Sequence, residues 1–209
     1  MFNDNVSTHF KFTYFFSSFL LCYLFLLIIM FVQYIEANGR LFPNHEILLT
    51  TKKLAFFILV ILSFISFLSL LYVKKKIGES VAYLRSNGRI GSIGYSYNNG
   101  SREFILGVLL PVVTTISVPD TPLTGIVSVM LIQFILGYFY WHSNELFVNV
   151  PLMMVGYSLV IGKENNQNIL LFIENSQLKA LLGKEIKFVH LGKVEDSNLG
   201  VVGKENINE

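Results

Sequence analysis

Four stretches of apolar residues without a charged side chain stand out along the chain. A transmembrane helix needs about 20 mainly apolar residues, because the hydrocarbon layer is about 30 Å thick and a helix rises about 1.5 Å per residue. The pattern predicts spans at about residues 12–35, 54–73, 104–118 and 123–140. The last two are separated by Pro119-Asp120-Thr121-Pro122, which predicts a helical hairpin with a tight turn.

After residue 145 the apolar residues fall into short runs, as is typical of strands. A helix of one or two turns is predicted over Ser176–Gly183, with a serine N-cap and a glycine stop. The predicted strands are Leu152–Ile161, Ile169–Ile173, Glu185–Leu191 and Leu199–Val202. Such a unit predicts a small β-barrel or curled sheet that needs support from the bilayer, from the other loop or from a neighbouring subunit.

The expected fold class is therefore a membrane all-α domain of four transmembrane helices, residues 1–145, followed by a small C-terminal cytoplasmic β-rich domain, residues 146–209. One alternative makes the first span a cleaved signal peptide, but its apolar run exceeds the usual length of about 7–15 residues and no A-x-A site follows. Another alternative makes the last two runs a buried hairpin of a soluble protein. The two long spans upstream favour the membrane interpretation.

Composition and charge support a membrane protein. Apolar residues make up 53% of the chain and charged residues 14%, whereas a soluble domain has about a quarter charged residues. The net charge of +2 gives no sign of direct nucleic-acid binding. The single cysteine, Cys22, excludes an intrachain disulfide framework and a multi-cysteine zinc site.

Lysine and arginine are concentrated in the loop after the second span, which begins Lys74-Lys75-Lys76, and in the tail. Because basic residues remain on the cytoplasmic side, we expect a multi-pass protein of the bacterial inner membrane with its N-terminus and C-terminus in the cytoplasm. The same loop contains a weakly alternating segment, Arg89–Tyr97, in which a short hairpin is conceivable, with Asn99-Gly100 as its turn.

The predicted spans contain no ionisable side chain, which argues against a proton-coupled transporter. Ser63, Ser66 and Ser69 recur at three-residue spacing, which predicts a close helix–helix contact or, as the alternative, a polar pore lining. The acidic residues and His190 of the tail have no spacing that suits a nucleophile, a metal or an acid–base pair. We therefore expect no enzyme activity, no catalytic residue, no metal and no cofactor.

Five basic side chains are candidates for contact with a soluble partner or with anionic membrane-lipid heads. They are Arg85, Arg89, Arg102, Lys179 and Lys187. The alternative for the three arginines is charge that only sets the topology of a flexible loop.

The start of the tail carries a resemblance to a known family. The residues are Asn149-Val150-Pro151-Leu152, Gly156-Tyr157, Leu170-Leu171-Phe172-Ile173 and Ile186-Lys187-Phe188-Val189. With the layout of four spans they resemble the KwaA family, the membrane subunits of the bacterial Kiwa anti-phage defence system. Val150 departs from the plain Asn-Pro pair of that pattern.

The resemblance implies a non-enzymatic sensor and scaffold that forms a homo-oligomer in the inner membrane. It implies that the cytoplasmic face holds a soluble effector, KwaB, which binds DNA, while this chain binds none directly. Asn149, Pro151, Gly156 and Tyr157 would then be structural and turn the chain into the tail. The alternative function is a small membrane channel or an immunity-type membrane protein, favoured by the serines of the second span.

Overall fold

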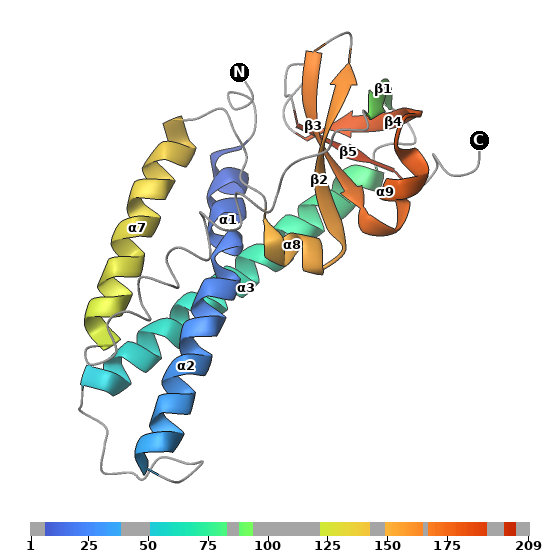
Figure 1. The fold of residues 1–209 in the computed structure, drawn as a ribbon. Coiled ribbons are helices and arrows are strands. Elements are labelled where there is room, and N and C mark those ends of the chain that lie inside the picture. Colours follow the sequence, from blue (N-terminus) through green and yellow to red (C-terminus); the bar gives the residue numbers. More distant parts are fainter. Residues whose placement is uncertain are drawn as a thin grey trace.

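A computed structural model describes residues 7–38, 51–82, 88–93, 122–142, 149–164, 167–191 and 199–203. Long helices and a β-barrel lie side by side, and one long helix runs from the foot of the helical part to the barrel (Figure 1). The helices are α1 Thr8–Ser18, α2 Leu20–Asn38, α3 Thr51–Ala82, α7 Pro122–His142, α8 Val150–Met154 and α9 Asn175–Leu181. The strands are β1 Arg89–Ile93, β2 Tyr157–Glu164, β3 Gln167–Glu174, β4 Glu185–His190 and β5 Leu199–Val202.

The first apolar run forms two helices that meet at Phe19. Ser7 caps the start of α1, where its hydroxyl accepts a hydrogen bond from the Phe10 amide at 3.3 Å. Near the end of α1 the hydroxyls of Ser17 and Ser18 donate back to the carbonyls of Tyr14 and Phe15, at 2.8 and 2.6 Å. Such bonds compete with the helix ladder and tend to bend it. The apolar helix Thr8–Gln33 therefore has an irregularity at Phe19, where α1 gives way to α2.

Helix α3 runs without a break from the apolar layer to the barrel (Figure 1). Its buried side chains recur every three or four residues, which places them along one side of the helix. They are Ala55, Leu59, Ser63, Ser66, Ser69, Leu70, Val73 and Ile77. The serines therefore lie within the packed side of α3, with 8%, 0% and 8% of their surface exposed.

The five strands form a closed barrel in the order β1-β2-β3-β5-β4. Four neighbouring pairs are antiparallel, including β1 with β2 and β1 with β4, whereas β3 and β5 are parallel. Strand β1 comes from the loop after α3, and the other four strands come from the tail. The barrel therefore joins two parts of the chain that α7 and α8 separate.

The interior of the barrel is filled by side chains that face glycines on neighbouring strands. Phe188 and Leu171 are fully buried there, with Ile186, Val160 and Ile93 beside them. A Cβ atom added to Gly200 would lie 2.8 Å from the Phe188 ring and 2.9 Å from Leu171, and one added to Gly91 would lie 2.8 Å from the same ring. The ring therefore fits only because these positions have no side chain.

The expected fold of four transmembrane helices with a small C-terminal β-rich domain is wrong. Among the described residues, two helices are long and apolar enough to cross a membrane, Thr8–Gln33 and Lys53–Val81. The expected span 123–140 coincides with α7, whose apolar stretch Gly125–Tyr138 is shorter. The expected span 104–118 lies outside the described residues. The other described part of the chain contributes a five-stranded barrel, which hydropathy does not detect.

The β part also differs from the expected one, because it is not confined to the C-terminal end. Residues 89–93 pair with β2 and β4, and the expected turn at Asn99-Gly100 lies outside the described residues. The strand expected from Leu152 begins at Tyr157, since Val150–Met154 forms α8 with proline in its first turn. The later strands and the helix of the tail are confirmed, with small shifts of their ends.

The close packing at the glycines inside the barrel predicts that one added methyl group destabilises the fold. We expect Gly200→Ala to lower the stability of the barrel by about 1–3 kcal/mol, because the added Cβ forces the Phe188 ring and Leu171 apart. Thermal unfolding of the purified protein in detergent, with hydrogen exchange of the β4 and β5 amides, measures the effect. Gly78→Ala is the matched control: nothing lies within 4 Å of its added Cβ, and alanine favours the helix. Equal unfolding of Gly200→Ala and the native protein would contradict the packing described.

Candidate functional site

The junction between the helices and the barrel is organised by Asn149. This buried side chain caps α8, where its Oδ1 accepts a hydrogen bond from the Leu152 amide at 3.0 Å. Its Nδ2 donates to the Tyr14 carbonyl at 3.1 Å and to the Ser17 hydroxyl at 2.5 Å. One amide group therefore holds α8, which leads into the barrel, against α1.

The turn between α8 and the barrel is closed by hydrogen bonds to Asn175 at the start of α9. The Asn175 amide donates to the Gly156 carbonyl at 2.8 Å, and its side chain donates to the Met153 carbonyl at 2.8 Å. The Ser158 hydroxyl donates to Asn175 Oδ1 at 2.6 Å. Gly156 has φ +105°, a conformation that favours glycine. The chain therefore enters β2 in one defined direction.

A charged cluster lies at the end of the barrel where β1 and β2 meet. Glu164 is 13% exposed; its Oε1 lies 3.4 Å from the Arg89 Nη1 atom, and its Oε2 lies 3.2 Å from the His190 Nε2 atom. These side chains come from β2, β1 and β4, at positions that continue the inward-facing rows of Gly162, Gly91 and Phe188. The cluster therefore links the loop strand to the strands of the tail.

The outward side of β1 and its neighbours forms a second surface, here called the β1 face. It consists of Ile90, Ser92, Ile161, Lys163, Glu185 and Lys187. Ile90 is 64% exposed and lies opposite Lys187 in the ladder, while Ser92 lies opposite Lys163. Figure 1 places β1 and β4 on the side of the barrel away from α1 and α7. Among the described residues, the side chains of this face are exposed.

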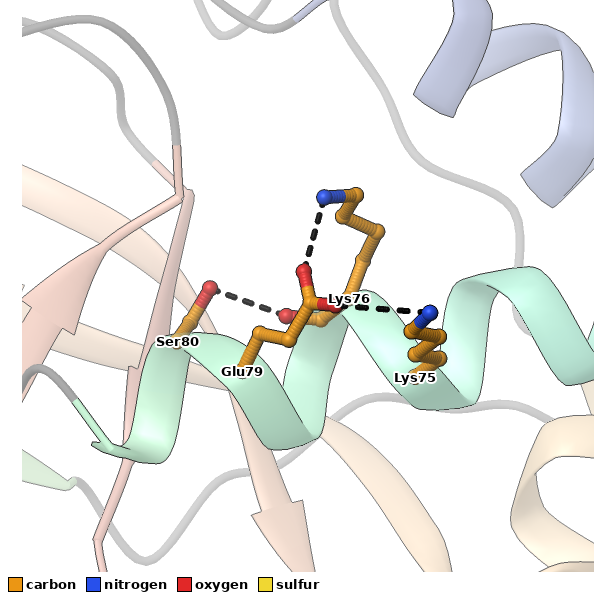
Figure 2. Close-up of polar contacts among 4 residues, drawn as sticks. All are labelled: Lys75, Lys76, Glu79 and Ser80. Carbon is orange, nitrogen blue, oxygen red and sulfur yellow. Dashed lines mark hydrogen bonds and ion pairs between the residues drawn. The ribbon is translucent and has the colours of Figure 1, made fainter.

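The basic turn of α3 lies between its apolar part and the barrel (Figure 2). Lys76 Nζ donates to Glu79 Oε2 at 2.7 Å, and Lys75 Nζ lies 3.9 Å from Glu79 Oε1. The hydrogen bond from Lys76 lowers the pKa of the Glu79 carboxyl, and the charges of both lysines add to this. The Ser80 hydroxyl donates to the Lys76 carbonyl at 3.0 Å. These exposed pairs leave a net positive charge at this level of the helix.

The candidate residues from the sequence lie in different places. Arg89 belongs to the charged cluster and Lys187 to the β1 face, whereas Lys179 is exposed on α9. Arg85 and Arg102 lie outside the described residues. Asn149 and Gly156 form the junction and turn described above, Pro151 lies in the first turn of α8, and Tyr157 begins β2.

Sequence reasoning missed the residues that only strand pairing brings together. Glu164 and His190 were treated as scattered groups, yet Glu164 of β2 contacts both Arg89 of β1 and His190 of β4. Ile90 gave no signal of its own, because an apolar residue in a strand is ordinarily taken to face the core. The described residues contain no group of three side chains of His, Cys, Asp or Glu that could hold a metal ion.

Comparison with protein-family models supplies an identification. Residues 10–196 match the model described as anti-phage protein KwaA. The chain belongs to the KwaA family. The match includes both apolar helices, the loop strand β1 and most of the barrel, so the KwaA family assignment covers the helical part and the barrel alike. Comparison with curated proteins and with solved structures finds no match.

Family membership establishes a role in anti-phage defence, in a system with other subunits. It agrees with the resemblance noted in the sequence, which covered the same layout of apolar segments and tail. In this KwaA chain, two helices are long and apolar enough to cross a membrane, by length and composition.

The hydrogen bonds at the junction predict that Asn149 contributes more to the stability of the fold than an exposed asparagine does. We expect Asn149→Ala to destabilise the protein by about 1–3 kcal/mol, because α8 loses its cap and buried groups of α1 lose their partner. Thermal unfolding of the purified protein in detergent measures the loss. Asn168→Ala, at an exposed position of β3, is the control and should change little. A loss of similar size in both variants would show that the junction does not depend on Asn149.

Proposed function

We propose that this chain is the sensor and scaffold subunit of an anti-phage defence complex and that it holds a soluble effector at its cytoplasmic side. The observation that carries the proposal is the shared hydrophobic core of the helices and the barrel. Residues of α1 and α3, such as Phe10 and Ile77, are buried in the same cluster as Phe172 and Val201 of the barrel. A displacement of the apolar helices would therefore reach the barrel through packed side chains.

The proposed location is the bacterial inner membrane, with the N-terminus and the barrel both in the cytoplasm. Two apolar helices that cross once in each direction would return the chain to the side on which it began. Helix α1 packs on the barrel near the start of the chain, which supports a common side for both. Lys74, Lys75 and Lys76 follow the apolar part of α3, and such residues favour the cytoplasmic side.

The proposed partner is a soluble effector resembling KwaB, and the β1 face is its proposed contact. Exposed Ile90 supplies apolar area, and Lys163, Lys187 and Glu185 supply a charged rim around it. Interfaces of this kind combine an apolar centre with a polar rim. We further propose that the chain is a homo-oligomer in membrane lipid, that it binds no nucleic acid directly and that it is not an enzyme, as the family resemblance implies.

A charge introduced at Ile90 tests the proposed contact. We expect Ile90→Glu to abolish co-purification of the KwaB-like effector encoded with the chain and to remove protection in a phage plating assay. The barrel should remain folded, since a glutamate would lie opposite Lys187, and opposite charges across a ladder are compatible. Co-purification from membranes extracted in mild detergent measures binding directly.

Met154→Glu is the matched control, because Met154 is 72% exposed on α8 and lies outside the β1 face. The control should retain the effector and the protection. Effector retained by Ile90→Glu would place the contact elsewhere on the molecule. No effector bound to the native chain, with both proteins present in the cell, would reject the scaffold function itself.

A further inference from the structure

The connectivity of the barrel has a specific pattern. β1, β2 and β3 follow one another as antiparallel neighbours, then β5 lies beside β3 in parallel and β4 closes the barrel against β1. Helix α9 connects β3 to β4, and its Leu181 is buried with the residues of the barrel interior. A five-stranded Greek-key barrel with this order and this helix is the arrangement of the OB fold.

The first connection of the barrel is unusually long. It runs from the end of β1 at Ile93 to the start of β2 at Tyr157 and includes α7 and α8. Connections in compact domains are usually about 4–6 residues long. The helical segment is therefore an insertion between the first two strands of the barrel.

OB folds bind oligonucleotides and oligosaccharides on the outward face of β2 and β3 and on the loops beside it, where bases stack on aromatic side chains. In this chain Leu159 of β2, Phe172 of β3 and Val201 of β5 are paired across the strands in one row of that face. Their exposed fractions are 7%, 0% and 0%. The row that would meet a ligand is therefore already covered.

Aromatic rings of α1 cover Phe172, the middle residue of this row, while α8 packs against β2 and α3 against β5. Phe10 lies edge-on to the Phe172 ring with centroids 6.3 Å apart, and Tyr14 lies 5.9 Å from the same ring. Phe10 and Tyr14 are themselves 3% and 1% exposed, so the contact excludes water from both sides. Asn149 holds the same turn of α1 through the Tyr14 carbonyl.

The charge on this face also fits a helix better than a nucleic acid. The outward residues of the two strands are mostly apolar or neutral, with Lys163 near one end and Glu174 near the other. They are Tyr157, Leu159, Ile161, Lys163, Asn168, Leu170, Phe172 and Glu174. A phosphate backbone requires a row of Lys or Arg, and this row is absent from the described part of the face.

We infer that the barrel is an OB-type barrel whose ligand face is occupied at its centre, around Phe172, by α1 of the same chain, which serves there as an internal docking segment. The inference goes beyond the proposed scaffold function, because it concerns how α1 binds the barrel. It is independent of whether an effector binds. Since α1 continues through Phe19 into the apolar helix α2, the docked segment links that helix to the barrel.

A photoreactive phenylalanine analogue at position 10 tests the contact in the full-length protein in nanodiscs, and it keeps the ring that the site holds. We expect crosslinks from position 10 to peptides of β3. The same analogue at position 12 is the control, because Phe12 is 51% exposed on the same helix, and it should crosslink to lipid or solvent instead. Crosslinks from position 10 to lipid or to another subunit, with none to β3, would overturn the inference.

A measurement of oligonucleotide binding tests whether the ligand face of the barrel is occupied. We expect the full-length protein to leave the fluorescence anisotropy of a labelled single-stranded oligonucleotide unchanged at physiological salt. Saturable binding that Phe172→Leu weakens at least tenfold would show an open OB ligand face and would overturn the inference. Neither outcome depends on capture of the effector, so failure here is distinguishable from failure of the scaffold function.

Discussion

Closure of the barrel by β1 is the constraint on which the rest of the structure depends. Without Arg89–Ile93, the edges of β2 and β4 would expose unpaired amide and carbonyl groups, which are costly when buried and prone to pairing with other chains when exposed. Because β1 follows α3 in sequence, the tail completes its barrel only with a segment tied to an apolar helix. The barrel and the helical part therefore form one folding unit.

Two helices, α1 and α3, attach the apolar part of the chain to the barrel. Helix α3 reaches the barrel without a break, whereas α1 is separated from α2 at Phe19. The attachment through α3 is therefore stiff. The attachment through α1 can bend, because the Ser17 and Ser18 hydroxyl bonds near the end of α1 weaken its backbone hydrogen bonds.

The candidate functional residues fall into two groups with different physical roles. Asn149, Glu164 and Arg89 hold segments together through buried or half-buried hydrogen bonds and ion pairs. Ile90 and Lys187 face outward on the β1 face. Loss of a residue in the first group is expected to lower stability, whereas the second group is the proposed contact surface. Arg89 belongs to the first group, although its charge alone suggested the second.

The sequence by itself determined the features that follow from neighbouring residues. Apolar runs located the long helices, short apolar runs located β3, β4 and β5, and the glycine stop located the end of α9, although the helix begins at Asn175 and not with a cap at Ser176. Tertiary structure alone decided that residues 89–93 close the barrel, that α1 ends at Ser18 and that its aromatic rings cover Phe172. Periodicity reports which side of an element is apolar, but it does not report which distant segment will cover that side. That choice depends on the shape and register of surfaces that exist only once the chain has folded.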